Sequence, residues 1–418
     1  MLEFFYKERR ALVDFRRGPL GPHFDGFAVE LKGKGYYRDY ARNILSTCCL
    51  FNAFLIEEGI KSYQRISPDL TESFLDVYLK GIRSIAGYQP RLTAKRQITH
   101  FHTYLVKTDV VKPFVPKPVV TCYSWLLEPH LKYLQTECQL TEWVIKTRRN
   151  QLDAFLKGLG DKVSRKRIRS LDPLSIEAYI KQHLQQSPHN LHNLVSGIRG
   201  FLRFCARQGY TSRDLSGMIP SVPRYRFASL PKGISESELQ QILNAIPKDS
   251  AIGSRDYAIM VLMMGYGIRS TQVASLRLED IGWSRSTIRI RAAKAGKEVV
   301  VPLLEPVGEA AIRYLRFRPE NHHRQVFLWT RAPYGPMSAA AISRMVQVYM
   351  NRAGVKKPGR GSHTLRHAWA IRALTEGSPM KAIADVLGHR CLDTTFIYAK
   401  ADLKTLRQVA MPWPEVKS

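Results

Sequence analysis

Two proline-bearing stretches divide the sequence into three segments, and they constrain the fold more than any other feature. The first covers residues 112–118, KPFVPKP, and the second runs over residues 219–233. Proline fixes its own backbone torsion and lacks an N–H donor, so these stretches are expected to be extended linkers. We therefore predict three domains, over residues 1–115, 123–228 and 233–418.

The first two segments share one helical plan. Each contains a long helix, a middle helix that begins beside a proline, and a final helix with aromatic and apolar residues. The predicted helices span residues 37–58, 67–79, 93–106, 142–156, 171–183 and 191–207. Proline suits a helix start because the N–H that it lacks has no partner there. We interpret the segments as two copies of one small helical domain, with chance similarity of amphipathic helices as the alternative.

The third segment mixes helices with a small sheet. Ser235 and Glu238 form a capping-box pattern at a helix start, and residues 256–264 are an apolar helix. Residues 287–302 alternate in polarity around a break at residues 294–296, which predicts a β-hairpin. Residues 326–329 are a candidate third strand, and the sequence from residue 339 onward is predicted to be helical. The predicted fold is mainly α with a small antiparallel β-sheet.

The positive charge is large and evenly distributed. Lys and Arg number 64 against 35 Asp and Glu, a formal net charge of +29. The excess is +7 over residues 1–122, +10 over residues 123–232 and +12 over residues 233–418. Solubility usually needs a net charge of only about 2–8 in a small domain. A long polyanion bound by several domains explains the distribution better, so we expect a nucleic-acid partner.

Other classes are disfavoured by what the sequence lacks. Its longest apolar stretch is about half of the roughly twenty residues that a membrane span needs, so no membrane partner is expected. The N-terminus has no signal-peptide core. The six cysteines show no CxxC spacing, and the pairs His100–His102 and His322–His323 have no third ligand at suitable spacing, so neither a metal site nor a disulfide framework is predicted.

Cations, imidazoles and one tyrosine recur in short stretches of the third segment. Cleaving a phosphodiester without a metal requires fixed cations around the phosphate oxygens, a nucleophile and an acid for the leaving oxygen. Arginine forks match phosphate geometry, and histidines donate hydrogen bonds and move protons. A tyrosine becomes a nucleophile when nearby cations favour its anion. The candidate residues are Arg269, Lys294, His363, Arg366, His389 and Tyr398.

This set resembles the catalytic set of the tyrosine recombinases, the phage integrase family. His363-Thr-Leu-Arg-His resembles the family's H-x-L-R-H box, and Leu387-Gly388-His389, followed nine residues later by Tyr398, resembles its L-G-H…Y box. The motifs cover residues 233–410. The resemblance implies a mixed α/β catalytic domain at residues 233–418, preceded by a helical SAM-like core-binding domain at residues 123–228 that clamps DNA. Residues 1–115 are expected to be a further helical SAM-like domain, for DNA binding or for assembly.

The resemblance also implies a role for each residue. Tyr398 attacks the scissile phosphate and forms a 3′-phosphotyrosine bond. Arg269 and Arg366 bind the phosphate oxygens, and His389 donates a further hydrogen bond. His363 assists proton transfer. The covalent intermediate implies that no cofactor and no metal are required.

The acid that protonates the 5′ oxygen is the lysine of the hairpin in this family. Lys294 is our choice, because Lys297-Glu298-x-x-Val301-Pro302 resembles the family's second strand and leaves Lys294 in the turn. Lys297 is the competing candidate. One residue departs from the pattern: Gln272 stands where the family usually has Glu or Asp, three residues after the first arginine. We expect it to weaken support of the site without abolishing activity.

Contacts to DNA are expected from basic residues of the middle segment and the second linker. The run at residues 165–169 is predicted to be a solvated loop facing DNA, with a localisation signal as the minor alternative. The predicted DNA-binding residues are Arg148, Arg149, Arg165, Lys166, Arg167, Arg169, Arg199, Arg203, Arg224 and Arg226.

The leading hypothesis is a site-specific recombinase that acts on double-stranded DNA carrying specific recombination sites. It implies a homo-oligomer, a dimer on one site and a tetramer in the synapse, with related recombinases of the same mobile element as further partners. A bacterial cytoplasmic, nucleoid-associated location follows. The alternatives are a DNA-binding synapsis subunit with weak cleavage and a type IB topoisomerase. A helix at residues 402–409 and the tail after it are expected to dock on a neighbouring protomer.

Overall fold

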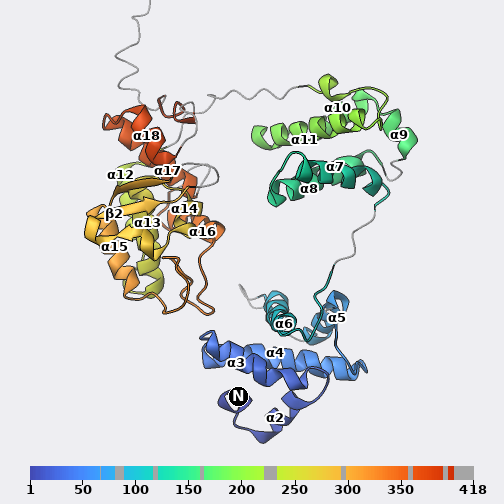
Figure 1. The fold of residues 1–418 in the computed structure, drawn as a ribbon, viewed down its shortest axis with the longest axis vertical. Coiled ribbons are helices and arrows are strands. Elements are labelled where there is room, and N and C mark those ends of the chain that lie inside the picture. Colours follow the sequence, from blue (N-terminus) through green and yellow to red (C-terminus); the bar gives the residue numbers. More distant parts are fainter. Residues whose placement is uncertain are drawn as a thin grey trace, which may run out of the picture. The chain divides into compact units, whose positions relative to one another are not determined.

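The computed structural model describes residues 1–65, 67–80, 89–115, 121–160, 164–220, 233–292, 298–355, 361–388 and 394–399. By backbone contacts, Val115–Ala228 form one compact unit, and Met1–Phe114 and Ser229–Ser418 form the other. The larger hydrophobic cores draw on Leu2–Val111, Tyr123–Ile219 and Ile234–Ala368. The described secondary structure is mainly helical, as predicted (Figure 1). The three-domain division stays a prediction.

The N-terminal part is a helical bundle around a phenylalanine-rich core. Its elements are α1 Leu2–Phe5, α2 Arg9–Arg16, η1 Gly21–His23, α3 Phe24–Gly33, α4 Arg38–Glu57, α5 Pro68–Tyr78 and α6 Pro90–Lys107. Ser67 caps α5 by accepting a hydrogen bond from the Leu70 N–H, and Pro68 follows it at the helix start. The ring centroids of Phe24 and Phe27 lie 4.8 and 4.7 Å from that of Phe101, so α3 packs against α6.

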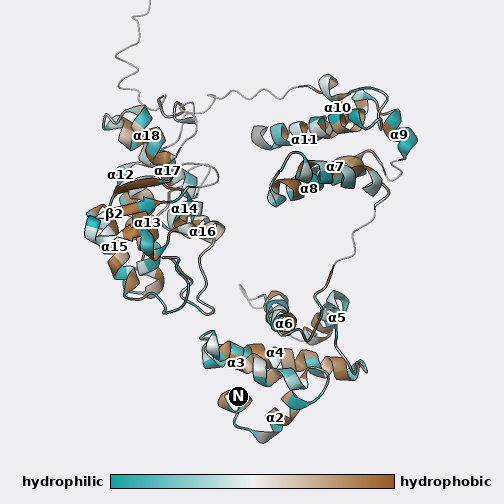
Figure 2. Ribbon diagram, in the orientation of Figure 1, coloured by the Kyte–Doolittle hydropathy of each residue, from teal (hydrophilic) through white to brown (hydrophobic). Residues whose placement is uncertain are grey.

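The unit at residues 115–228 repeats much of this plan. Its elements are α7 Ser124–Thr136, α8 Glu142–Gly158, α9 Arg165–Arg169, α10 Pro173–Lys181, α11 Pro188–Arg207 and η2 Ser216–Met218. Asp172 caps α10 as Ser67 caps α5. The sequence prediction missed α7, which continues through Pro129. Helices in both units carry hydrophobic and hydrophilic stretches side by side (Figure 2).

The C-terminal part surrounds one buried helix. Its elements are α12 Glu236–Asn244, α13 Ala251–Tyr266, α14 Ser270–Ser275, η3 Leu278–Asp280, β1 Ile281–Gly282, η4 Trp283–Arg285, β2 Thr287–Ile290, β3 Val299–Pro302, α15 Glu305–Leu315, α16 Ala339–Arg352, α17 Ser362–Thr375 and α18 Met380–Leu387. The capping box at Ser235 and Glu238 is confirmed. Most of α13 is buried, and α14, α15, α16 and α17 all contact it.

The predicted hairpin is confirmed, but the predicted third strand was wrong. β2 pairs with β3 in antiparallel register, with Ile288 opposite Val301. The third strand is β1, which pairs on the other edge of β2. Residues 326–329 instead form one isolated antiparallel bridge, between Leu328 and Pro336, outside the sheet. The Val326 N–H donates to the Leu276 carbonyl and the Leu328 N–H to the Tyr314 hydroxyl, so these donors are satisfied by other elements and the bridge does not extend into a strand.

A buried ion pair anchors α13. The Arg255 guanidinium donates from Nε and Nη2 to Asp256 Oδ1 over 2.8 and 2.7 Å, and Tyr349 donates to the other carboxylate oxygen over 3.1 Å. Both side chains of the pair are 5% exposed. Burial raises the pKa of Asp256, although Arg255 opposes this shift. Removal of one partner therefore leaves a buried charge without its counter-ion.

We predict that Asp256→Ala destabilises the C-terminal part by about 3–5 kcal/mol, the cost of breaking a buried pair from one side. Hydrogen exchange of the α13 amides reports this locally. Glu279→Ala is the control, because Glu279 pairs with Arg324 at the surface over 3.2 Å, and such pairs contribute at most ~1 kcal/mol. Equal protection of α13 in the two variants would contradict the prediction.

Candidate active site

The first motif arginine follows directly on the end of α13. Gly267 ends this helix with φ 60°, and a Cβ there would lie 2.9 Å from the Trp369 ring, so both torsion and space require glycine. The chain then buries Ile268 and leaves Arg269 half-buried at the start of α14.

Helix α17 caps the end of α13 with three side chains. The last carbonyls of a helix have no partner within it, so they accept from outside. Residues 366, 369 and 372 follow each other at intervals of three and lie on one face of α17. Arg366 Nη1, Trp369 Nε1 and Arg372 Nη2 donate, in that order, to the carbonyl oxygens of Gly267, Gly265 and Met264 over 3.0, 2.8 and 2.9 Å.

The two arginines converge on the end of a second helix. Leu387 is the last residue of α18, which Gly388 ends in the left-handed conformation at φ 63°. The Leu387 carbonyl accepts from Arg366 Nη2 over 2.7 Å and from Arg269 Nη1 over 3.3 Å. Burial, and then Arg269, lowers the pKa of Arg366 to about 10, so the side chain stays charged near neutral pH. Two cations are thus held together by one carbonyl, at the negative end of a helix dipole.

Tyr398 lies against this pair. Its ring is 1% exposed and packs in a hydrophobic cluster with Ala370, Ala373, Ile383 and Leu387, between α17 and α18. Burial raises the pKa of the phenol, and Arg366 and Arg269 act in the opposite direction. Burial has the larger effect, so the hydroxyl is protonated near neutral pH.

Two histidines of α17 lie beside these groups. His363 is exposed, and the pKa of its imidazole is lowered by desolvation, then by Arg366 and Arg269. His367 is half-buried, and its Nδ1 lies 2.9 Å from the Tyr398 hydroxyl oxygen. His367 stood at the end of the H-x-L-R-H motif, but we assigned it no role from the sequence. The motif itself was the signal, since residues four apart share a helix face.

Gln272 makes two hydrogen bonds in a buried position. Its Oε1 accepts from the Arg269 backbone N–H over 3.0 Å, and its Nε2 donates to the Arg291 carbonyl over 3.1 Å. The Arg291 side chain in turn forms a bidentate ion pair with Asp280, over 2.7 Å in both bonds. The amide therefore connects the first arginine to the residue that follows β2. A carboxylate could make the first bond but not the second, because it has no donor.

Several predicted residues lie outside the described part of the chain. They are Lys294, Lys297, His389, Arg224, Arg226 and the predicted helix at residues 402–409. Among the described residues, Arg269, His363, Arg366 and Tyr398 lie close together.

The predicted DNA-binding residues that the structure describes fall into two groups. Arg165, Lys166, Arg167 and Arg169 are exposed on α9, where the Arg165 guanidinium lies 5.3 Å from the Trp125 ring centroid. The predicted loop is thus a short helix.

The others have protein partners within the unit. Arg148 donates to the Asn193 carbonyl over 2.6 Å, and Arg199 to the Ile219 carbonyl over 2.6 Å. Arg149 forms a bidentate pair with Glu128, and Arg203 Nε lies 3.4 Å from the Ser216 hydroxyl. These bonds give each of the four a structural role that the sequence did not indicate.

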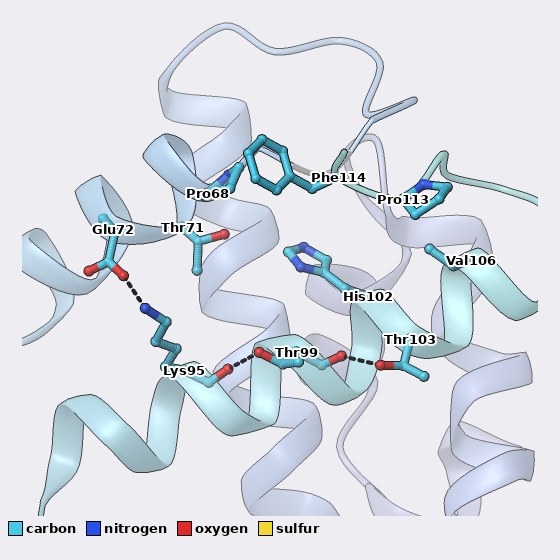
Figure 3. A pocket seen from close by; sticks show the side chains of 10 residues that line it. All are labelled: Pro68, Thr71, Glu72, Lys95, Thr99, His102, Thr103, Val106, Pro113 and Phe114. Atoms are coloured by element: carbon cyan, nitrogen blue, oxygen red, sulfur yellow. Dashed lines mark hydrogen bonds and ion pairs between the residues drawn. The ribbon is translucent and has the colours of Figure 1, made fainter. Parts of the chain in front are cut away.

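A separate pocket of about 410 Å³ lies between α5 and α6 (Figure 3). His102 lines it, with its Nε2 3.0 Å from the Tyr63 hydroxyl, and burial lowers the pKa of this imidazole to about 4. Thr99 and Thr103 donate to carbonyls of their own helix. The pocket thus presents polar groups that already have partners.

Two features are absent from the described part of the chain. No group of three or more His, Cys, Asp or Glu residues there could hold a metal ion. No helix among those residues has the length and apolar character to cross a bilayer.

The geometry defines a class of site: two arginine forks next to a tyrosine and two imidazoles, suited to bind a phosphate and attack it.

The sequence over residues 232–404 matches the phage integrase family. The integrase/recombinase y4rF of Sinorhizobium fredii is 30% identical over 427 residues, covering 99% of this chain and 96% of the relative. Tyrosine recombinase XerD of Xanthomonas campestris is 32% identical over 234 residues, covering 53% of this chain and 71% of the relative.

Solved structures share the fold. A lambda integrase (75–356) dimer bound to a COC′ core site aligns with a TM-score of 0.56 at 16% identity, covering 71% of this chain and all of that chain. XerH bound to palindromic difH aligns with a TM-score of 0.54 at 16% identity, covering 81% and 93%. The chain belongs to the phage integrase family of tyrosine recombinases. It is a site-specific DNA recombinase, an enzyme that cleaves and rejoins DNA strands.

We predict that Gln272→Glu destabilises the C-terminal part near neutral pH, because the Arg291 carbonyl loses its donor, at a cost of about 1–3 kcal/mol. The introduced carboxyl can donate to the Arg291 carbonyl only when it is protonated. The destabilisation is therefore expected to be smaller at acidic pH, where the carboxyl is protonated, and larger as the pH rises and the carboxylate forms.

Thermal unfolding of the variant and the wild type between pH 4 and pH 8 measures this difference. Gln272→Leu is the control, since it loses both hydrogen bonds at every pH. A Gln272→Glu protein as stable as the wild type at pH 8 would show that the donor to Arg291 is dispensable.

Proposed function

We propose that Tyr398 is the nucleophile of this recombinase and that Arg269 and Arg366 bind the scissile phosphate. The observation that supports this most is the convergence of both guanidiniums on the Leu387 carbonyl, next to the buried Tyr398. An arginine has five N–H donors in a planar fork, and this geometry matches phosphate oxygens. The paired cations stabilise the charge that develops on these oxygens during attack.

The remaining roles follow the family motifs. Attack by the Tyr398 oxygen forms a 3′-phosphotyrosine bond and releases a 5′ hydroxyl, which later reverses the reaction on the exchanged strand. His389 donates to the phosphate and His363 assists proton transfer. Lys294 protonates the leaving 5′ oxygen, with Lys297 as the alternative. Because the covalent bond conserves the energy of the broken one, the reaction is proposed to need neither a metal nor a nucleotide cofactor.

Gln272 was the one feature that favoured a synapsis subunit with weak cleavage. Its two hydrogen bonds show an amide that fits its place, so it gives no reason to prefer that alternative. A type IB topoisomerase would share the chemistry but would act without site preference.

We further propose that the enzyme acts as a dimer on each recombination site of double-stranded DNA and as a tetramer in synapsis, at the bacterial nucleoid. Four strands must be exchanged, which requires four nucleophiles. Structures of lambda integrase as a dimer on a core site and as a tetramer on a Holliday junction have the same fold. The tail after residue 400 is proposed to dock on a neighbouring protomer, and related recombinases of one mobile element to join the assembly.

The target sequence can be recovered by crosslinking the protein to DNA and sequencing what it retains. On a nicked suicide substrate of that sequence, we predict that the wild type forms a covalent adduct in the presence of EDTA. Tyr398→Phe should form none, because it lacks the attacking oxygen, while it still retards the DNA in a gel. An adduct that persists in Tyr398→Phe would refute the assignment of the nucleophile.

The salt dependence of DNA binding tests which of the predicted basic residues contact DNA phosphates. Each phosphate contact adds about −0.9 to the slope of log K against log salt. We predict that Lys166→Ala combined with Arg169→Ala reduces the magnitude of this slope by about two. Arg149→Ala, which removes a charge already paired with Glu128, is expected to leave the slope nearly unchanged. A larger change from Arg149→Ala than from the double variant would reverse the assignment.

A further inference from the structure

The nucleophile of the proposed reaction has a hydrogen-bond partner that the motif comparison left without a role. His367 Nδ1 lies 2.9 Å from the Tyr398 hydroxyl oxygen, which is within ordinary hydrogen-bond distance. The two ring centroids are 5.6 Å apart, with an angle of 57° between the ring planes. The imidazole therefore meets the phenol at its polar end.

The Tyr398 hydroxyl must lose its proton when it attacks phosphorus. Its ring is enclosed by Ala370, Ala373, Ile383 and Leu387, and this burial disfavours the phenolate more than the two arginines favour it. The resting nucleophile is thus a neutral phenol, which is a weak nucleophile until a base accepts its proton.

His367 is placed and poised to be that base. Among the residues that the structure describes, the charged and titratable groups near His367 are His363 and Arg366 on α17, Arg269 before α14, and the Tyr398 phenol itself. Burial, followed by His363 and Arg366, lowers the pKa of the His367 imidazole, so it is unprotonated near neutral pH. An unprotonated Nδ1 can accept the hydrogen bond that the phenol donates.

The two imidazoles of α17 occupy different environments. His363 and His367 are four residues apart on one helix face, but His363 is exposed, whereas His367 is half-buried and contacts the phenol. A half-buried base that already contacts the hydroxyl needs no reorganisation before it accepts the proton. The exposed His363 is accessible to solvent.

We propose that His367 is a further catalytic residue, the base that accepts the Tyr398 proton during cleavage and returns it during rejoining. In cleavage the O–H bond of Tyr398 breaks and its proton moves to Nδ1. The tyrosine oxygen bonds to phosphorus, the bond from phosphorus to the 5′ oxygen breaks, and the leaving oxygen takes a proton from the acid, Lys294 in our assignment. Rejoining reverses each step. The inference rests on the proposed role of Tyr398.

His367→Asn is the sharpest test, because an amide can hydrogen-bond the phenol but cannot take its proton at neutral pH. We expect single-turnover adduct formation to slow by about 10²- to 10⁴-fold, the usual contribution of a general base. Two nicked substrates of the recovered target sequence locate the defect: an ordinary phosphodiester, and one with sulfur in place of the bridging 5′ oxygen. A thiolate leaves without an acid, so Lys294→Ala is expected to recover on the second substrate and His367→Asn is not.

The pH profile separates His367 from His363. The wild-type rate is expected to fall at acidic pH as His367 becomes protonated, and His367→Asn should lose this limb while His363→Asn retains it. A His367→Asn rate within about twofold of the wild type, or its recovery on the sulfur substrate, would overturn the proposal. So would loss of the acid limb in His363→Asn alone.

Two controls distinguish a folding defect, a wrong nucleophile assignment and a wrong role for His367. Gel retardation of the target DNA by His367→Asn at the wild-type protein concentration shows that the variant is folded, and His367→Gln serves as a second variant if it is not. An adduct in Tyr398→Phe would reject the nucleophile assignment itself. The absence of an adduct in Tyr398→Phe, together with a wild-type rate in His367→Asn, would reject only the role of His367.

Discussion

The site depends on the unpaired carbonyls at the ends of two helices. The last turn of α13 and the last residue of α18 present oxygens that no helical N–H can reach. Arg366, Trp369 and Arg372 satisfy the first set, and Arg366 together with Arg269 satisfies the Leu387 carbonyl. The end of α13, helix α17 and the end of α18 are thereby held around one point, and the same bonds that satisfy the backbone fix both guanidiniums in place.

This arrangement explains how two like charges are kept close together before DNA is bound. Arg366 is 4% exposed, and burial, followed by its proximity to Arg269, lowers its pKa, so the pair carries an electrostatic cost in the free protein. The carbonyl dipoles offset part of that cost. If the pair binds the scissile phosphate, as proposed, that phosphate would remove more of the cost.

Gly267 and Gln272 fix the backbone around Arg269, and each position requires its own residue type. Gly267 is required because the chain must turn with a positive φ directly beneath Trp369, and the buried amide of Gln272 connects Arg269 to the residue after β2. A family comparison alone describes Gln272 as a departure from an acidic residue. The structure shows instead that its donor has a partner that a carboxylate could not serve.

The sequence by itself determined the helical character and the hairpin, and it singled out Arg269, His363, Arg366 and Tyr398 as candidates, because local periodicity and short motifs encode them. The tertiary structure decided what depends on contacts between distant segments. It supplied β1 as the third strand, since residues 326–329 satisfy their donors elsewhere. It gave Arg148 and Arg199 backbone partners and brought His367 to the Tyr398 hydroxyl. A residue's partners depend on packing between helices, and neither charge nor spacing along the chain reveals that packing.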